Sequence, residues 1–162
     1  MRLCRHKERA QSDKTAKALA CYGLYLPEHQ EQSRMHGRML LRFVQGRPVS
    51  ALTCRFLSWL AQQLESEGWK VLVLFWDNAS WHVSRQVRAW IGQHNRQVKR
   101  SGGLRLLVCP LPKKSPWLNN IEPKWVHGKR AVIEPEQVLS PEALAERLCR
   151  YYGCEQHEHL KA

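Results

Sequence analysis

Two apolar segments on either side of an amphipathic stretch constrain the fold more than any other feature. Lys70–Trp76 (KVLVLFW) and Leu104–Cys109 (LRLLVC) are almost continuously apolar, which is typical of strands covered on both faces. Between them, Ser84 can cap a helix with an apolar side. That side consists of Val87, Trp90 and Ile91. The order strand, helix, strand predicts a parallel pair.

A hairpin and a helix are expected ahead of this pair. Ala18–Leu26 and Arg38–Val44 have the composition of strands, and turn formers occur in the polar segment Pro27–Gly37 between them. Ser50 can cap a helix that is closed by Gly68. The apolar face of this helix consists of Leu52, Phe56, Leu60 and Leu64.

Two further helices are expected after the second apolar strand. A Pro-rich loop, 109–117, leads to a helix that begins near Asn119. Ser140 caps the last helix, which has Pro141 at its first position and stops at Gly153. These elements predict an α/β fold, a three-layer domain in which helices flank a mixed sheet.

The basic charge is concentrated in one block. The 162 residues have a net charge of +12, and residues 81–130 alone contain eleven basic residues and one acidic residue. Nucleic acid is the obvious partner for such a field, and a solvated basic surface is the alternative. The longest apolar run, Val71–Trp76, is too short for a bilayer, and no apolar stretch follows the charged N-terminus. We therefore expect a cytoplasmic protein without membrane contact.

The six cysteines are scattered, mostly in apolar segments, and form no CxxC pair. We therefore expect buried, reduced thiols. Cys149, Cys154, His157 and His159 could in principle surround zinc, but their spacings differ from those of structural zinc sites.

Two acidic residues are candidates for catalysis. Asp77 follows the first apolar strand, and ligands collect at the carboxyl ends of strands in open α/β sheets. A turn-forming Asp-Asn pair is the alternative. Glu122, the only acid of the basic block, lies near a helix start, where a capping box with Asn119 is the alternative. Together, two carboxylates in a positive surface can hold Mg²⁺ against a phosphodiester.

Both acids lie in longer motifs. The segment VLVLFWDNASWHVSRQVRAWIGQHN, followed by LLVCPLPKKSPWLNNIEPKWVHGKR, resembles the catalytic region of bacterial insertion-sequence transposases, in the mariner-related branch of the DDE superfamily endonucleases. The likeness covers residues 17–155. It implies a ribonuclease H-like fold, DNA cleavage at transposon ends, transfer of the freed 3′-hydroxyl to target DNA, and Mg²⁺ or Mn²⁺ as cofactor. It also implies that Asp77 and Glu122 are the second and third acids of a metal-binding triad.

Other positions in these motifs are candidates for DNA contact. Asn78 and His82 could bind phosphate or orient Asp77, and a structural turn is the alternative. Trp117 and Trp125 could stack on bases, but we expect them to pack beneath the site. The expected phosphate contacts are Lys113, Lys114, Lys124, Lys129 and Arg130.

The chain departs from the family pattern in several places. The first strand, with the first Asp of the triad, has no counterpart, because residues 1–16 form a polar segment in which Asp13 precedes the wrong element. Asp13 as a substitute ligand is the alternative. The usual N-terminal helix-turn-helix is also missing. Asn120 stands where relatives commonly have Pro, and Gln97–Gly103 (QVKRSGG) is expected to be a basic loop that lengthens the spacing between the acids.

We therefore expect a truncated catalytic domain, 17–155, followed by a C-terminal tail, 156–162. With two of three carboxylates it should bind metal weakly and not transpose alone. Unpaired backbone at the missing strand should favour oligomers. The alternatives are a non-catalytic, DNA-binding remnant that forms a homodimer or interferes with an intact transposase, and a nuclease of the same fold that acts on RNA–DNA hybrids.

Overall fold

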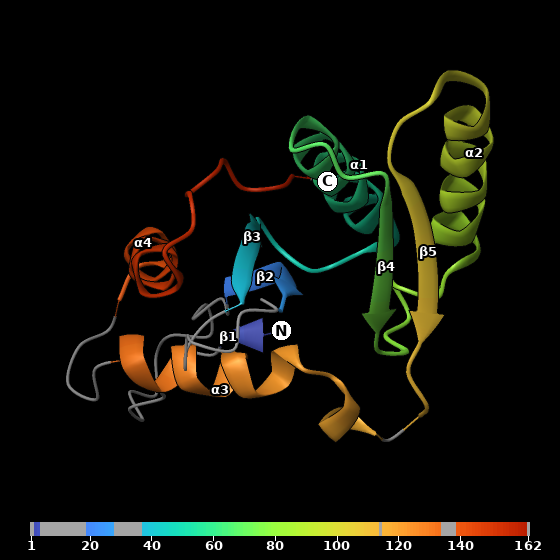
Figure 1. Ribbon diagram of the computed structural model, residues 1–162. Coiled ribbons are helices and arrows are strands. Elements are labelled where there is room, and N and C mark those ends of the chain that lie inside the picture. The colour runs from blue at the N-terminus through green and yellow to red at the C-terminus, as the bar shows by residue number, and fades with distance from the viewer. Residues whose placement is uncertain (1, 4–18, 28–36, 114, 134–138, 162) are drawn as a thin grey trace. The chain divides into compact units, whose positions relative to one another are not determined.

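The computed structural model describes residues 2–3, 19–27, 37–113, 115–133 and 139–161. The predicted order of hairpin, helix, strand, helix, strand, helix, helix is confirmed, and with it the α/β class (Figure 1). The chain forms two compact units. Unit 1 contains Met1–Arg47 and Asn120–Lys161, and unit 2 contains Pro48–Asn119.

Unit 1 is built on an antiparallel sheet with the strand order β1-β2-β3. β2 (Leu19–Leu26) and β3 (Arg38–Val44) form the predicted hairpin, in which Gly23 lies opposite Leu41. β1 (Arg2–Leu3) pairs with the other edge of β2. This two-residue strand contains no acidic residue, so the absence of a counterpart to the family's Asp-bearing first strand stays a prediction.

Two helices, α3 (Ile121–Val132) and α4 (Pro141–Tyr152), pack on this sheet. The predicted ends of α4 are confirmed. Ala143 N–H donates to Ser140 Oγ at 3.1 Å, and Gly153 ends the helix in the left-handed conformation at φ 62°. The core of unit 1 joins sheet residues to helix residues: Leu19, Cys21, Met39, Leu41 and Phe43 with Trp125, Val132, Leu144, Ala145, Leu148 and Cys149.

The segment expected as a C-terminal tail is bound to β3. Leu160 N–H donates to Phe43 O at 2.8 Å, and Gln45 N–H donates to Leu160 O at 2.9 Å. Leu160 is also buried. Leu160 is therefore part of the packed structure of unit 1.

Unit 2 consists of α1 (Ser50–Ser66), β4 (Val71–Trp76), α2 (Arg85–Ser101) and β5 (Arg105–Pro110). β4 and β5 form a parallel pair, as predicted. The predicted capping of α1 by Ser50 is wrong, because Ser50 is already helical and the N-cap is Val49, without a side-chain hydrogen bond.

The second helix of this unit is longer than predicted. Its start is confirmed, since Val87 N–H donates to Ser84 Oγ at 3.2 Å. The expected basic loop Gln97–Gly103 is wrong, because α2 continues to Ser101 and only the two glycines follow it. Gln, Lys and Arg are good helix formers, and basic residues in the last turn interact favourably with the helix dipole.

β4 is covered on one face only. Leu72 and Leu74 are buried, whereas Val71, Val73 and Phe75 are 45%, 44% and 64% exposed. The prediction of cover on both faces is therefore wrong for this strand. The physical reason is that α1 and α2 contact each other and so lie on the same side of a two-stranded sheet.

Among the described residues, the strands therefore include antiparallel pairing in unit 1 and parallel pairing in unit 2. None of the helices described is long and apolar enough to cross a membrane.

Candidate active site

Asp77 directly follows β4, at the carboxyl end of the parallel pair. Its side chain is 53% exposed. Asp77 Oδ1 accepts hydrogen bonds from Ala79 N–H at 2.9 Å and from His82 Nδ1 at 2.8 Å. In the part of the chain that the structure describes, Oδ2 has no hydrogen-bond partner. One carboxylate oxygen is therefore anchored, and the other is available to a ligand.

The anchoring contacts also favour the ionised form of Asp77. The hydrogen bond from His82 is the largest cause of a lowered pKa at Asp77, the Ala79 amide acts in the same direction, and partial burial opposes both. The bond from Ala79 N–H is that of a local Asx turn. A turn-forming role and a ligand role for Asp77 are thus compatible, because the turn uses only Oδ1.

His82 is itself held in place by aromatic neighbours. Its ring stacks on Trp76 with centroids 5.0 Å apart and meets the edge of Trp81 at 5.9 Å. Only 19% of the His82 side chain is exposed. Since a carboxylate can only accept, Nδ1 is the protonated nitrogen in this contact. The geometry supports the predicted orientation of Asp77 by His82, and a phosphate contact by His82 stays a prediction.

Asn78 joins the loop after β4 to the segment after β5. Its Nδ2 donates to Leu111 O at 2.6 Å, and Leu111 N–H donates to Trp76 O at 2.9 Å. These bonds hold the backbone next to Asp77 in place. Contact between Asn78 and phosphate stays a prediction.

Glu122 lies in the first turn of α3, in unit 1, and is exposed. The alternative of a capping box is wrong, because the helix N-cap is Asn120 and its side chain makes no capping hydrogen bond. Among the described residues, the Glu122 carboxylate has neither a hydrogen bond nor an ion pair. Asp77, in contrast, belongs to unit 2.

The two acids suit a divalent metal on chemical grounds. Each has carboxylate oxygen without a protein partner, and Mg²⁺ prefers carboxylate oxygen and water as ligands. Among the described residues, no three His, Cys, Asp or Glu side chains come together as a metal site. Asp13, the alternative ligand, lies outside the described residues.

The basic residues predicted to contact DNA are spread over both units. Lys113 is exposed after β5, and Lys114 lies outside the described residues. Lys124 Nζ lies 5.0 Å from the centre of the Tyr25 ring, a cation–π contact. Lys129 and Arg130 lie in the last turn of α3, where positive charge is favourable. DNA contact by these residues stays a prediction.

The two tryptophans near Glu122 have different environments. Trp125 is buried in the core of unit 1, and its ring meets Tyr152 edge-on at 6.2 Å, which confirms the packing predicted for it. The same prediction is wrong for Trp117, which is 75% exposed in a short 3₁₀ helix, Pro116–Leu118. The Trp117 ring is therefore accessible, and base stacking by this ring stays a prediction.

The cysteines do not form a zinc site with the nearby histidines. Cys149, Cys154, His157 and His159 are all described, yet no three of them come together. The described cysteines are free thiols, of which Cys21, Cys54 and Cys149 are buried as predicted, whereas Cys109 and Cys154 are only partly buried. Burial raises the pKa of Cys21 to about 12, which makes this thiol unreactive.

The sequence from residue 35 to residue 145 matches the family model of the DDE superfamily endonucleases. The match includes both Asp77 and Glu122 and extends from before β3 into α4. No curated protein and no solved structure matches the chain. The α/β architecture is compatible with a ribonuclease H-like domain.

Proposed function

Because the chain belongs to the DDE superfamily endonucleases, we propose that it is the catalytic part of a transposase that cuts DNA at transposon ends. The supporting observation is the Asp77 carboxylate, which has one oxygen anchored by His82 and the other without a protein partner. The basic residues of 81–130 suit a polyphosphate substrate. The motifs around both acids favour a bacterial insertion-sequence element of the mariner-related branch.

The reaction would proceed by two phosphoryl transfers. A divalent metal, Mg²⁺ or Mn²⁺, held by Asp77 and Glu122 would activate the attacking oxygen and stabilise the leaving oxygen. In cleavage, a water oxygen bonds to phosphorus while the bond from phosphorus to the 3′ oxygen breaks, and that oxygen leaves as a 3′-hydroxyl. In strand transfer, this hydroxyl attacks a target phosphodiester and displaces the target's own 3′ oxygen. His82 keeps the free oxygen of Asp77 directed toward the site.

We also propose that this chain alone binds metal weakly and gives no strand transfer. This proposal rests on the expectation that the sequence has no counterpart to the first acid of the family's triad. Two carboxylates supply fewer ligands and less negative charge than three, so metal affinity falls.

Manganese binding, followed by electron paramagnetic resonance, tests the assignment of the two acids. Asp77→Asn and Glu122→Gln should each weaken binding about tenfold or more. The matched control is Glu142→Gln, which neutralises another exposed acid in the first turn of a helix, α4. Unchanged binding in both site variants would overturn the proposal.

Plasmid nicking tests the predicted inactivity. Incubation with Mn²⁺ and supercoiled DNA should give no cleavage above the rate of Asp77→Ala. Turnover that is abolished by Asp77→Ala would confirm Asp77 as catalytic and contradict the inactivity of the chain alone.

A non-catalytic role in DNA binding is the second candidate, and the net charge of +10 over residues 81–130 favours it. Such a protein would associate with the nucleoid and could pair with a second copy or with an intact transposase. DNA affinity would then fall steeply with salt but be unchanged by chelator and by Asp77→Asn. If an RNA–DNA hybrid competes for the protein more strongly than duplex DNA does, the result would instead favour a nuclease of the same fold.

A further inference from the structure

α2 has five basic residues on one side, which we name the α2 basic stripe. Its members are Arg85, Arg88, Arg96, Lys99 and Arg100, and all are exposed. At about 100° of rotation per residue, they fall within about 120° of the helix circumference. The stripe is therefore one continuous surface rather than a set of scattered charges.

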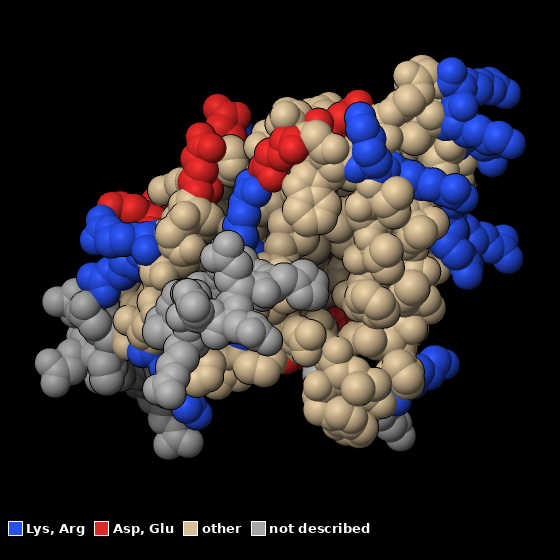
Figure 2. All heavy atoms as spheres, in the orientation of Figure 1, with Lys and Arg blue, Asp and Glu red and all other residues tan. Residues whose placement is uncertain are grey.

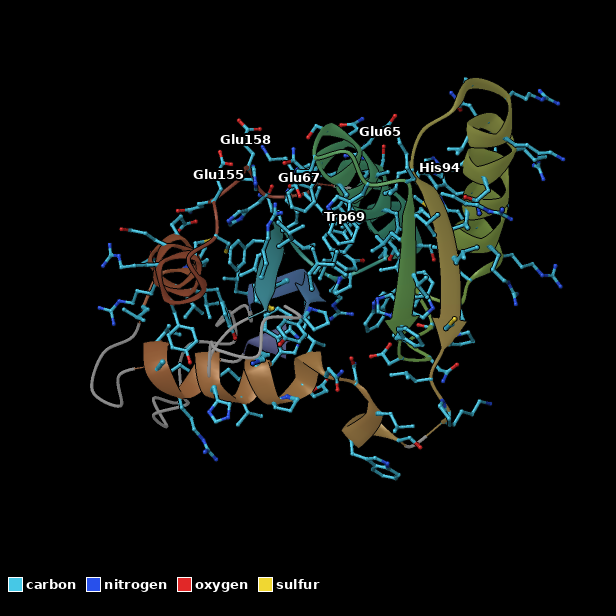
Figure 3. All side chains as sticks on the ribbon, in the orientation of Figure 1. Glu65, Glu67, Trp69, His94, Glu155 and Glu158 are labelled. Atoms are coloured by element: carbon cyan, nitrogen blue, oxygen red, sulfur yellow. The ribbon has the colours of Figure 1, made fainter. Side chains whose placement is uncertain are left out.

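Hydrogen bonds to β5 fix the direction in which the stripe points. His94, which lies between α2 and β5 in Figure 3, donates from Nε2 to Leu104 O at 2.8 Å. Asn95 donates from Nδ2 to Leu106 O at 2.7 Å and accepts from Leu106 N–H at 2.9 Å. Val87, on the same side, is fully buried. Since the stripe lies on the far side of the helix from Val87, it faces solvent.

Within the described residues, no acidic side chain pairs with the stripe. The sequence has no Asp or Glu between Asp77 and Glu122. None of the five side chains forms an ion pair within the part of the chain described. Figure 2 shows Lys and Arg gathered along the right-hand edge of the molecule, over α2. Such a field attracts a polyanion.

The dimensions of the stripe suit duplex DNA. Arg85 and Arg100 are about 22 Å apart along the helix axis, which equals the rise of about six base pairs. The stripe has two clusters, and the gap from Arg88 to Arg96 is about 12 Å, the width of a major groove. Each cluster can therefore reach phosphates on a different strand.

The gap between the clusters is lined by Ala89 and Gly92, whose side chains add no bulk. A Cβ added at Gly92 would meet only an Arg96 guanidinium nitrogen, at an ordinary 3.6 Å. The fold therefore does not need glycine here, although glycine inside a helix costs about 1 kcal/mol relative to alanine. A small residue at this point lets a nucleic-acid backbone approach the helix.

We propose that the α2 basic stripe binds the phosphates of duplex DNA on both sides of a major groove, beside the Asp77 site. This proposal rests on the proposed function, because it assumes that DNA is the substrate. It adds a contact surface that lies on residues other than the two acids and the lysines predicted from the motifs.

Duplex binding in chelator tests the stripe separately from metal chemistry. The variant Arg96→Gln with Arg100→Gln should bind a duplex of about 30 base pairs about tenfold more weakly, with a salt slope smaller by about two. The control, Arg47→Gln with Arg150→Gln, removes the same charge from exposed positions of unit 1 and should change affinity less than about twofold. Equal losses in the two double variants would overturn the proposal.

A second pair of variants tests the effect of side-chain size at position 92 without changing the charge of the stripe. Gly92→Gln should weaken duplex binding, whereas Gly92→Ala should not, although both residues favour the helix over glycine. Equal affinities in these two variants would contradict close approach at Gly92. Tighter binding to single-stranded DNA or to anionic vesicles than to the duplex would overturn the assignment of the partner.

The stripe and the proposed function can fail independently. The Arg96 and Arg100 double variant should bind Mn²⁺ like the wild type, because neither arginine is a proposed metal ligand. Loss of metal binding at Asp77 without any effect of the stripe variants would refute the stripe alone. The opposite pattern would refute the catalytic proposal and leave the stripe as a DNA-binding surface.

Discussion

The contact between His82 and Asp77 lowers the pKa of the candidate metal ligand. Because the His82 hydrogen bond is the largest cause of the lowered pKa, His82→Ala should raise the pKa of Asp77 toward that of an ordinary aspartate. His82→Asn can retain a donor near the position of Nδ1 and should raise it less. Carboxyl-carbon NMR during a pH titration measures this difference directly. If the titration curves of both variants match that of the wild type, His82 does not set the ionisation of Asp77.

The same contact gives a stability effect whose sign is fixed. The pKa of Asp77 is lower in the folded chain than in the unfolded chain, so its contribution is complete at neutral pH. That contribution is lost as the pH falls through the folded pKa of Asp77. Asp77→Asn should therefore lose less stability than the wild type on acidification, as measured by urea unfolding at several pH values. A steeper loss in Asp77→Asn would contradict the assignment.

At the scale of elements, α3 and α4 are in close contact at Gly128. A Cβ at this position would overlap the Tyr152 hydroxyl and lie 2.7 Å from its Cζ. The Tyr152 hydroxyl donates to Lys124 O, so the ring cannot move away without losing a hydrogen bond. Gly128→Ala should destabilise the protein by about 1–3 kcal/mol, measured by chemical denaturation. The control Gly92→Ala, in an open part of α2, should not destabilise it.

The Asn95 side chain binds to the outer edge of β5, which has no strand beside it in the described structure. Its side chain replaces a neighbouring strand by bonding both backbone groups of Leu106. Asn95→Ala should cost about 1–3 kcal/mol, because a backbone donor and acceptor lose their partners. Gln97→Ala, on the exposed side of the same helix, is the control. Equal unfolding midpoints for the two variants would show that water replaces Asn95 without cost.

How far the sequence predicts these elements depends on whether their signals are local. Ser84 and Ser140 cap their helices as predicted because capping involves residues only three positions apart. Gln97–Gly103 was predicted as a basic loop that lengthens the spacing between the acids, whereas α2 continues to Ser101 and is held in place by bonds from His94 to Leu104 and from Asn95 to Leu106. Those partners lie about ten residues away and leave no local pattern.

The same distinction between local and non-local signals applies to the candidate site. The positions of Asp77 after a strand and of Glu122 in a first helical turn follow from local patterns. The burial of Trp125 also follows from a local pattern, because Trp125 lies one helical step from Ile121. The exposure of Trp117 does not, because it depends on what packs against the ring. Likewise, pairing of Leu160 with β3 joins residues more than a hundred positions apart, which no sequence window can predict.

At the scale of the whole molecule, the free edge of β4 should control self-association. Arg105 N–H donates to Lys70 O and Leu111 N–H donates to Trp76 O, so alternate residues of β4 face β5. Val71, Val73 and Phe75 therefore direct their backbone groups to the opposite edge, where no strand pairs in the described structure. Their side chains are also exposed and apolar. An edge of this kind is a template for pairing with a second copy.

We therefore expect concentration-dependent association in sedimentation experiments, and Val73→Lys should suppress it because a charge on an exposed strand opposes pairing. Val126→Lys is a close control, since Val126 is 45% exposed, like Val73 at 44%, but lies on α3. The two substitutions add the same charge, so a general gain in solubility would affect both variants equally. A monomeric wild type, or equal suppression by both variants, would show that the edge of β4 does not drive association. Suppression by Val73→Lys alone would locate the contact at the strand that leads to Asp77.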